Sequence, residues 1–553
     1  MSTNEQRPTI QPEDLFGLKF LQGAQVSPDG RTAVYTVSHV GPDKDAAEDD
    51  PDARKEYVAL WLIDLAGGES RQFTMGTARD TNPQWSPDGS QIAFLSTRDG
   101  KPQIYVIPVG GGEARAVTSL KQGVSGGPVW SPDGKHLAFA APPDPEPPDL
   151  ARPYRVTRHM YRFDAVGYLD RTAHDIWMVD VDGGAARKLT DDGCHNSMPL
   201  WSPDGTEVLY TALMFADEFR FYGRLRVVSL DGAVREIVGD WGYVLSSGWT
   251  PDGQKVVFVG GANDRPIGSK HDLWVIDRQG GEPKCRTASL AVGIGGSLQP
   301  DMAALQDNGG FPRLVLARDG ESAYVQVQEG GTIHIYRVAL DGPESLACVA
   351  SGERACFPLA VSDEQLLFGA SQLDNPLDLY VAAPDGSDER QLTHLNAELL
   401  RCRDLPAVEH LQFPGSDGTP VEGWVLKPPT GQPPYPAILY IHGGPHSGFG
   451  HIFSFDFQML AGAGYAVIFA NQRGSTGYGD AFATAIIGDW GNLDYTDLMA
   501  AVDEAIARGI ADPERLGVCG LSGGGNLSCW IVGHTDRFKA AVPENPVTNW
   551  ISF

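Results

Sequence analysis

The amino-acid sequence predicts a β-propeller followed by an α/β domain. Two features carry this prediction: a turn motif that recurs along the first part of the chain, and apolar strands that alternate with helices in the last part. The length of 553 residues supports it, because a single hydrophobic core does not grow so large. We place the N-terminal segment and propeller at residues 1–395 and the α/β domain at 396–553.

The recurring turn motif consists of Ser or Thr, then Pro, Asp and Gly. Proline fixes φ at the second turn position and glycine accepts a positive φ, so we expect each copy at the tip of a β-hairpin. Complete copies occur at residues 27–30, 86–89, 131–134, 202–205 and 250–253, and degenerate copies at 317–320 and 361–364.

Each turn is followed by an alternating strand and then by a second strand motif, as at residues 60–64 and 176–180. Seven turns and seven such strands predict seven units of about four antiparallel strands. A closed ring hides strand edges, whereas an open stack needs capping repeats, so we favour a seven-bladed propeller over a solenoid or two sandwiches. Residues 13–21 are expected to form a helix that leads into the first unit.

Two insertions interrupt the repeat. Residues 43–52 are acidic and polar, which is typical of a solvated surface loop. Residues 142–168 combine prolines with many arginine and aromatic side chains. We expect a structural flap there, with contact to a substrate as the alternative.

Strands alternate with helices in the second domain. We expect a hairpin at residues 410–426, buried strands at 437–442, 465–470, 516–519 and 538–542, and helices that include residues 458–464 and 494–508. Because these strands are apolar throughout, they indicate a parallel sheet covered on both faces.

The motif that indicates chemistry is Gly520-Leu521-Ser522-Gly523-Gly524, a G-x-S-x-G pattern between a buried strand and a helix. A sharp turn there lifts a serine hydroxyl clear of the sheet, and glycines permit the close approach of strand and helix. The pattern alone also occurs in ordinary loops. With the strand before it and the helix after it, we interpret Ser522 as a catalytic nucleophile.

A second motif, His442-Gly443-Gly444-Pro445, follows the first buried strand of this domain. Acyl transfer develops negative charge on a carbonyl oxygen, and rigid backbone N–H groups stabilise that charge. We predict that Gly444 and Gly523 supply these N–H groups, the alternative being an ordinary tight turn. We interpret His442 as a packing and hydrogen-bonding residue and not as the catalytic base.

Composition limits the partners. A net charge of −28 argues against nucleic acid or an anionic membrane as partner. The N-terminus is polar and no long apolar run occurs, so a cytoplasmic protein is expected. Seven cysteines without C-x-x-C spacing indicate neither a disulfide framework nor a zinc site, and the sequence requires no metal or organic cofactor.

Together the motifs resemble the prolyl oligopeptidase family of serine peptidases, and within it the acylaminoacyl-peptidase branch. The matching segments are residues 442–445, 471–479, 512–516 and 520–524, all behind the propeller repeat. The resemblance implies a seven-bladed propeller joined to an α/β-hydrolase domain, with short peptides hydrolysed through an acyl-enzyme and folded proteins excluded by a cavity between the domains. It places the nucleophile on Ser522 and the oxyanion donors on Gly444 and Gly523. The residue after the serine is often aromatic in this family and is glycine here.

The catalytic aspartate and histidine of such hydrolases follow the serine, on loops after later strands. The residues after Ser522 include one histidine, His534, and one aspartate, Asp536. Both lie too close to the elbow to serve it, so we expect them at a helix end or on the surface. We therefore expect a partial α/β-hydrolase domain, truncated after the nucleophile elbow, in which the triad Asp and His are not present and which is inactive alone.

Three expectations follow for activity and partners. The remainder of the hydrolase domain is expected in the same or a separate chain, covering the raw edge at residues 538–542. The substrate is expected to be a short peptide; the alternatives are an esterase or amidase that acts on small acyl substrates, and a propeller binding scaffold with an inactive hydrolase remnant. The sequence does not indicate which end of the peptide is recognised. It is compatible with a homo-oligomer.

Overall fold

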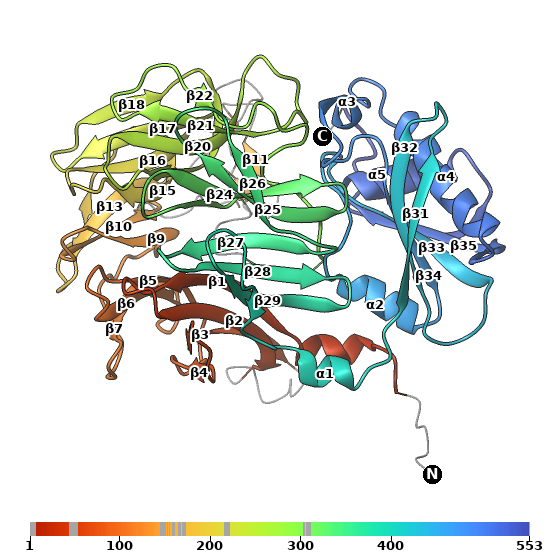
Figure 1. Cartoon of the computed structure of the whole chain (residues 1–553), viewed down its shortest axis with the longest axis horizontal. Coiled ribbons are helices and arrows are strands. Elements are labelled where there is room, and N and C mark those ends of the chain that lie inside the picture. Colours follow the sequence, from red (N-terminus) through yellow and green to blue (C-terminus); the bar gives the residue numbers. More distant parts are fainter. Residues whose placement is uncertain are drawn as a thin grey trace, which may run out of the picture.

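The computed structural model describes residues 7–43, 53–143, 173–214, 222–301 and 311–551, together with 151, 153, 155–156, 161–163, 167–168 and 305. Two parts lie side by side in it (Figure 1). Small antiparallel sheets, coloured red to green, form the first part, and a larger sheet with its helices, coloured blue, forms the second.

The first part contains five four-stranded sheets and one eight-stranded sheet among the described residues. The first three four-stranded sheets are β1 (Lys19–Val26), β2 (Thr32–Pro42), β3 (Arg54–Asp64) and β4 (Arg71–Gln72); β5 (Asp80–Trp85), β6 (Gln91–Ser96), β7 (Gln103–Pro108) and β8 (Arg115–Ala116); and β9 (Gly126–Trp130), β10 (His136–Ala141), β13 (Asp175–Asp180) and β14 (Arg187–Lys188). A separate pair, β11 (Arg162–Phe163) and β12 (Gly167–Tyr168), belongs to the Pro-rich insertion, most of which lies outside the described residues, as does nearly all of the acidic insertion.

The remaining four-stranded sheets are β15 (His195–Trp201), β16 (Glu207–Met214), β17 (Tyr222–Ser229) and β18 (Val234–Val238); and β19 (Gly242–Trp249), β20 (Lys255–Ala262), β21 (Asp272–Asp277) and β22 (Lys284–Cys285). The eight-stranded sheet comprises β23 (Leu314–Leu316), β24 (Ser322–Glu329), β25 (Thr332–Ala339), β26 (Leu346–Ala350), β27 (Ala355–Val361), β28 (Leu366–Gln372), β29 (Asn375–Ala382) and β30 (Arg390–Gln391). Its two halves meet through one parallel pair, Ile333 and Ala355.

The predicted hairpin tips are confirmed, because each complete Pro-Asp-Gly turn joins two antiparallel strands. In the first, the Ser27 hydroxyl donates to Asp29 Oδ1 (2.5 Å), the same oxygen accepts the backbone N–H of Arg31, and Gly30 has φ = 74°. The tryptophan before the turn also ties neighbouring sheets together: Trp130 Nε1, for example, donates to the carbonyl of Gln84 (3.0 Å). One short motif therefore shapes a turn and locks it to the previous sheet.

The sheets form a closed β-propeller. Strand β1 packs against β27 and β29, so the first and last sheets of the region adjoin. A shared apolar cluster joins them, with Leu21 and Tyr35 from one side and Leu367 and Leu379 from the other. Closure leaves no end of the stack to be capped.

The predicted helix at residues 13–21 is wrong. A short 3₁₀ helix, η1 (Pro12–Gly17), occupies the start of this range, and β1 begins at Lys19. A strand forms here instead of a helix because Lys19, Phe20 and Leu21 pair with β2. This pairing gives their backbone N–H and carbonyl groups hydrogen-bond partners at a sheet edge.

The second part is built on a six-stranded sheet in the order β31-β32-β34-β33-β35-β36. Its elements are α1 (Ala397–Arg401), β31 (Ala407–Pro414), β32 (Pro420–Lys427), β33 (Tyr435–Ile441), α2 (Phe455–Gly462), β34 (Ala466–Asn471), α3 (Asp480–Ala483), α4 (Leu493–Ala507), β35 (Ala511–Leu521), α5 (Gly523–Val532) and β36 (Phe538–Glu544). Strands β34, β33, β35 and β36 run parallel, as predicted, whereas β31 and β32 form the predicted antiparallel hairpin.

Apolar side chains cover both faces of this sheet. Leu439 and Ile441 of β33 share a cluster with α4 and α5, whereas Val467 and Phe469 of β34 face α2 and Leu373 of the propeller. Edge strand β36 differs, since six of its seven residues are exposed and the exposed fraction of Val542 is 56%. Strand β36 is therefore an exposed edge of the described sheet.

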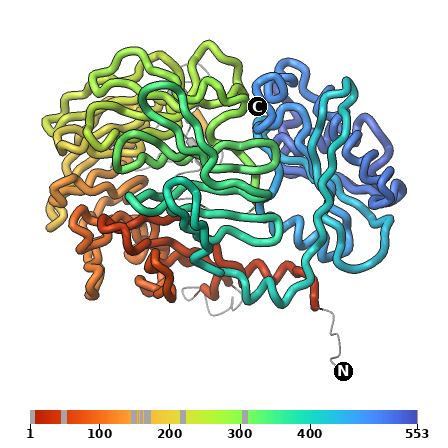
Figure 2. Tube along the Cα trace, viewed as in Figure 1, coloured from red at the N-terminus to blue at the C-terminus, as the bar shows by residue number. Residues whose placement is uncertain are grey.

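The chain before the propeller packs against the second part. Thr9 pairs with Asp404, and Ile10 shares an apolar cluster with Leu400, Phe453 and Phe455. In Figure 2 this red segment lies beside the blue-green chain that leaves the last propeller strands. All seven cysteines are free thiols. Within the described residues, no helix has the length and apolar character needed to cross a membrane.

Candidate active site

Ser522 occupies a sharp turn between β35 and α5. Its backbone has φ = 56° and ψ = −113°, a conformation that residues with a Cβ rarely adopt. The Ser522 N–H donates to the carbonyl of Glu544 (2.9 Å), and the Ser522 carbonyl accepts the N–H of Asn526 (2.9 Å). These two bonds hold the strained backbone while the residue itself stays exposed. The predicted strand, turn and helix are thus confirmed, and the helix begins at Gly523.

The glycines around Ser522 allow the helix to approach the sheet. A Cβ on Gly524 would lie 2.1 Å from the carbonyl oxygen of Ile441, and one on Gly520 would lie 2.5 Å from the same atom. A Cβ on Gly525 would lie 2.4 Å from the carbonyl oxygen of Glu544. No side chain fits at these distances, so the glycines are a steric requirement of the turn.

The two predicted oxyanion donors adjoin each other. An ideal Cβ on Gly523 would lie 3.2 Å from the backbone nitrogen of Gly444 and 3.1 Å from its carbonyl oxygen. Gly444 has φ = 114° and is exposed, whereas Gly443 before it is buried. A side chain at position 523 would therefore require the Gly444 backbone to shift slightly.

His442 fixes the peptide that carries the Gly444 N–H. Its Nδ1 lies 2.7 Å from the carbonyl oxygen of Gly443, and its Nε2 lies 2.8 Å from the Ser475 hydroxyl. Complete burial lowers the pKa of His442 to about 4, so the ring is neutral at pH 7. Because a carbonyl only accepts, the proton of the neutral ring sits on Nδ1. The structure therefore shows a buried hydrogen-bonding residue, as predicted.

No described histidine contacts the Ser522 hydroxyl, for which the described residues provide no hydrogen-bond partner. His446 Nδ1 lies 3.1 Å from the carbonyl oxygen of Gly474. His534 Nδ1 lies 2.7 Å from the carbonyl oxygen of Trp530, and its ring stacks on that indole at 4.0 Å. His534 and Asp536 are both exposed, at the end of α5 and just beyond it, where the sequence placed them.

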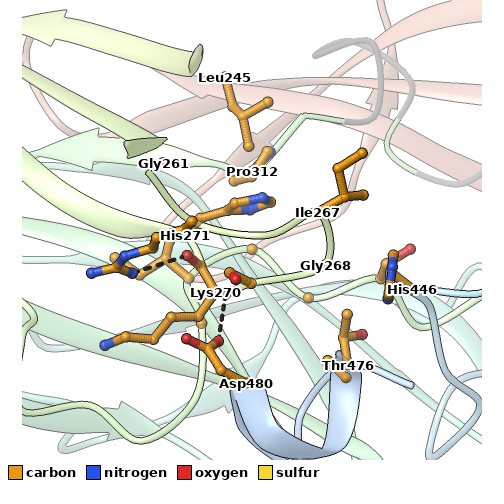
Figure 3. Close-up of a pocket in the computed structure, with 18 of the residues that line it drawn as sticks. Leu245, Gly261, Ile267, Gly268, Lys270, His271, Pro312, His446, Thr476 and Asp480 are labelled. Carbon is orange, nitrogen blue, oxygen red and sulfur yellow. Dashed lines mark hydrogen bonds between the residues drawn. The ribbon is translucent and has the colours of Figure 1, made fainter. Parts of the chain in front are cut away.

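A cavity of about 720 Å³ opens between the propeller and the second part; its lining includes His446, two residues after Gly444, but neither Gly444 nor Ser522 (Figure 3). Leu245, Ile267 and Pro312 of the propeller give it an apolar wall, and His446 and Thr476 face them from the other part. The exposed fraction of Ile267 is 82%, so much of this apolar surface is open to a ligand.

The cations of the cavity are paired with Asp272, whereas the carboxylate of Asp480 accepts only a backbone N–H among the described residues. Lys270 Nζ donates to the carbonyl of Leu290 (2.7 Å) and lies 3.0 Å from Asp272 Oδ1, and the Lys270 backbone N–H donates to Asp480 Oδ1 (2.7 Å; Figure 3). Burial lowers the pKa values of His271 and His446, which favours their neutral forms. The cavity therefore offers apolar surface, neutral imidazoles and the carboxylate of Asp480.

Residues 451–553 match the model of the prolyl oligopeptidase family, and residues 25–145 match that of the TolB beta propeller domain. The uncharacterized peptidase YuxL of Bacillus subtilis (strain 168) is 33% identical over 98% of this chain and 83% of its own length. The chain belongs to the prolyl oligopeptidase family. It is thus a serine peptidase of a β-propeller and hydrolase-domain architecture, as the sequence motifs implied.

Other relatives share this architecture. Dipeptidyl-peptidase 5 of Porphyromonas gingivalis is 26% identical over 98% of this chain and 79% of its own length. The structure of Pyrococcus horikoshii acylaminoacyl peptidase has a TM-score of 0.79 and 21% identity, covering 98% of this chain and 80% of that one. The second part of this prolyl oligopeptidase family member is accordingly its hydrolase domain.

Sequence reasoning missed the propeller side of the site. Residues 293–297 line the cavity, and Gln299 just after them contacts the His-Gly-Gly-Pro turn, yet the segment carries no catalytic motif. Its Gly293, Gly295 and Gly296 offered the one visible signal, since clustered glycines mark close approach of the backbone to another group.

Proposed function

We propose that this protein hydrolyses short peptides through an acyl-enzyme on Ser522. The observation that carries the proposal is the strained, exposed Ser522 turn with the Gly444 and Gly523 backbones in contact beside it. In this mechanism Ser522 Oγ attacks the carbonyl carbon, its proton passes to a base, and the Gly444 and Gly523 N–H groups bind the oxyanion. The amine leaves with that proton, and water then cleaves the ester to return Ser522.

We infer that the catalytic histidine and aspartate come from polypeptide outside the 553 residues. The described histidines nearest in sequence to the two motifs, His442, His446 and His534, are each bonded to other groups. The exposed outer edge of β36 offers a place where further strands of a hydrolase sheet pack. Such strands, in the same or a separate chain, would carry the two residues, and the 553-residue chain would be inactive without them.

We also propose that the propeller has seven blades, the five four-stranded sheets and the two halves of the eight-stranded sheet each forming one. The boundary between the domains then lies at residues 395 and 396, just before α1. The segment ahead of β1 crosses this division, because Thr9 pairs with Asp404 of the hydrolase domain.

The cavity supports a peptide with an apolar group as substrate. Its apolar wall favours an apolar side chain or acyl group. The net charge of −28 supports an enzyme without a nucleic-acid or anionic-membrane partner, and the polar N-terminus supports a cytoplasmic location. A homo-oligomer is part of this proposal, and light scattering on the purified enzyme tests it.

The proposed function is tested by hydrolysis with the protein expressed from its whole gene. We expect cleavage of chromogenic aminoacyl amides and short peptides, abolished by Ser522→Ala. A matched variant, Ser528→Ala, changes a fully buried serine on the same helix and is expected to retain activity if the fold survives. Activity that persists in Ser522→Ala would contradict the proposal, and turnover of simple esters alone would favour an esterase instead.

A further inference from the structure

One short segment of the propeller runs along the hydrolase domain beside the active site. We call residues 297–301 the interdomain strap. Its Ser297 carbonyl accepts the N–H of Gly448 (2.9 Å) and the Ser447 hydroxyl (2.6 Å), and the Gln299 N–H donates to the Gly448 carbonyl (2.9 Å). These bonds make a parallel bridge to the chain just after the His-Gly-Gly-Pro turn.

The strap is anchored at both ends. Leu298 packs with Ile333 and Ala355 of the propeller and with Ile452 of the hydrolase domain. Asp301 accepts the N–H groups of Phe455 (2.9 Å) and Asp456 at the start of α2. Gln299 therefore sits in the middle of a backbone that both domains hold in place.

The Gln299 side chain reaches the oxyanion turn itself. Its Oε1 accepts the backbone N–H of Gly443 at 3.0 Å, across 144 positions of sequence. Gly443 is buried, so without Gln299 this N–H would lose its partner away from water. The amide orientation follows from chemistry, because an N–H group requires an oxygen acceptor.

Two bonds thus fix the two peptide groups on either side of Gly443. Gln299 holds the 442–443 peptide by its N–H, and His442 holds the 443–444 peptide by its carbonyl. The second peptide carries the Gly444 N–H, so its direction depends on both bonds. Glycines impose few limits of their own on φ and ψ, and these contacts supply the missing rigidity.

We propose that Gln299 is a positioning residue for the oxyanion hole, supplied by the propeller. The proposal rests on the proposed function. It makes the oxyanion hole depend on contact between the two domains, because one of the two bonds that orient it comes from the propeller. Separation of the domains would withdraw Gln299 and relax the Gly444 N–H.

The test compares Gln299→Met with Gln458→Met in the protein expressed from its whole gene. Methionine has a similar length and lacks a strong acceptor. Gln458 is the matched control, since its Nε2 donates to the Leu373 carbonyl of the propeller (2.7 Å) through α2, away from the oxyanion turn. Both variants remove one glutamine bond between the domains, and only one removes a bond to Gly443.

We expect Gln299→Met to lower kcat about tenfold with KM nearly unchanged, less than the loss of a direct oxyanion donor. Affinity for a peptide boronic acid, which forms a tetrahedral adduct, should fall in parallel, while affinity for a product peptide stays constant. Gln458→Met should keep the wild-type kcat. Equal kcat in Gln299→Met and wild type, or equal losses in both variants, would overturn the proposal.

Hydrogen exchange gives a readout that does not depend on turnover. The peptide containing Gly443 should exchange faster in Gln299→Met and at the wild-type rate in Gln458→Met; unchanged exchange in Gln299→Met would contradict the proposal. The proposed function has its own test: it is contradicted if the Ser522→Ala variant keeps the wild-type activity. If Ser522→Ala is inactive and Gln299→Met behaves as wild type, the peptidase assignment stands and only the role of Gln299 is lost.

Discussion

At the residue scale, the conformation of Ser522 is the feature on which the site depends. A φ of 56° with ψ of −113° is costly for any residue that carries a Cβ. The hydrogen bonds to Glu544 and Asn526 hold the residue in this conformation. As a result, its hydroxyl is exposed beside two backbone N–H groups. The site therefore stores strain in its proposed nucleophile.

That strain predicts an order of stability between two inactive variants. Ser522→Gly should be more stable than Ser522→Ala by about 1 kcal/mol, because glycine reaches this φ without a steric penalty, which exceeds its cost in unfolded-state entropy. Midpoints of urea unfolding measured side by side check the difference. If Ser522→Ala is equally stable or more stable, the backbone at this position is not strained.

His442 predicts a dependence of stability on pH. Burial lowers its folded-state pKa to about 4, below the ordinary value near 6.5, so the unfolded chain binds the proton first as the pH falls. The neutral ring thus contributes stability that is complete above pH 6.5 and is lost on the way down to pH 4. Between pH 7 and pH 4.5 this loss is about 2–3 kcal/mol.

His442→Asn removes this titration and leaves the other titrating groups in place. The fall in unfolding free energy between pH 7 and pH 4.5 should therefore be smaller in the variant than in the wild type, whatever their difference at pH 7. Denaturant unfolding at the two pH values measures it. Parallel pH profiles for the two proteins would show that His442 is not held neutral.

At the element scale, an ion pair joins the loop after β34 to α4. Arg473 Nε and a second guanidinium nitrogen donate to Asp497 at 2.8 and 2.6 Å, and the Arg473 backbone N–H donates to the same carboxylate. Both side chains are almost fully buried, with exposed fractions of 3% and 0%. The pair fixes the start of residues 471–479, the segment that supplies Ser475 to His442.

Asp497→Asn should therefore destabilise the hydrolase domain by about 3 kcal/mol, because the buried guanidinium then keeps only the half-exposed carboxylate of Asp417 as a counter-charge. Asp503→Asn on the same helix is the control: Asp503 pairs with Arg537 but is mostly exposed, so a change within about 0.5 kcal/mol is expected. Thermal unfolding compares the two. Similar losses in both variants would mean that burial does not set the strength of the pair.

The sequence predicted those elements whose cause is local. The hairpin tips follow from proline and glycine in a four-residue turn, and the Ser522 elbow follows from an apolar run, two glycines and a helix start. The helix at residues 13–21 failed because the pairing of Lys19 with His39 lies outside any local pattern. The role of Gln299 could not be predicted for the same reason, since its partner Gly443 is 144 positions away in the sequence.

At the scale of the whole molecule, the propeller contributes to the site as well as standing beside it. Its loops form the apolar wall of the cavity, and its strap holds the turn that bears Gly444. The hydrolase sheet brings the Ser522 turn and the His-Gly-Gly-Pro turn together at the ends of two adjacent parallel strands, β35 and β33. Catalysis in this account thus depends on both domains in contact.

The central claim is that Ser522 is the nucleophile, and covalent labelling tests it most directly. A fluorophosphonate reacts with an activated serine, and mass spectrometry locates the adduct after digestion. With the protein expressed from its whole gene, we predict one adduct per chain, on the peptide that contains Ser522, and none in Ser522→Ala. An adduct on another serine, or no adduct in a protein that cleaves peptides, would contradict the account.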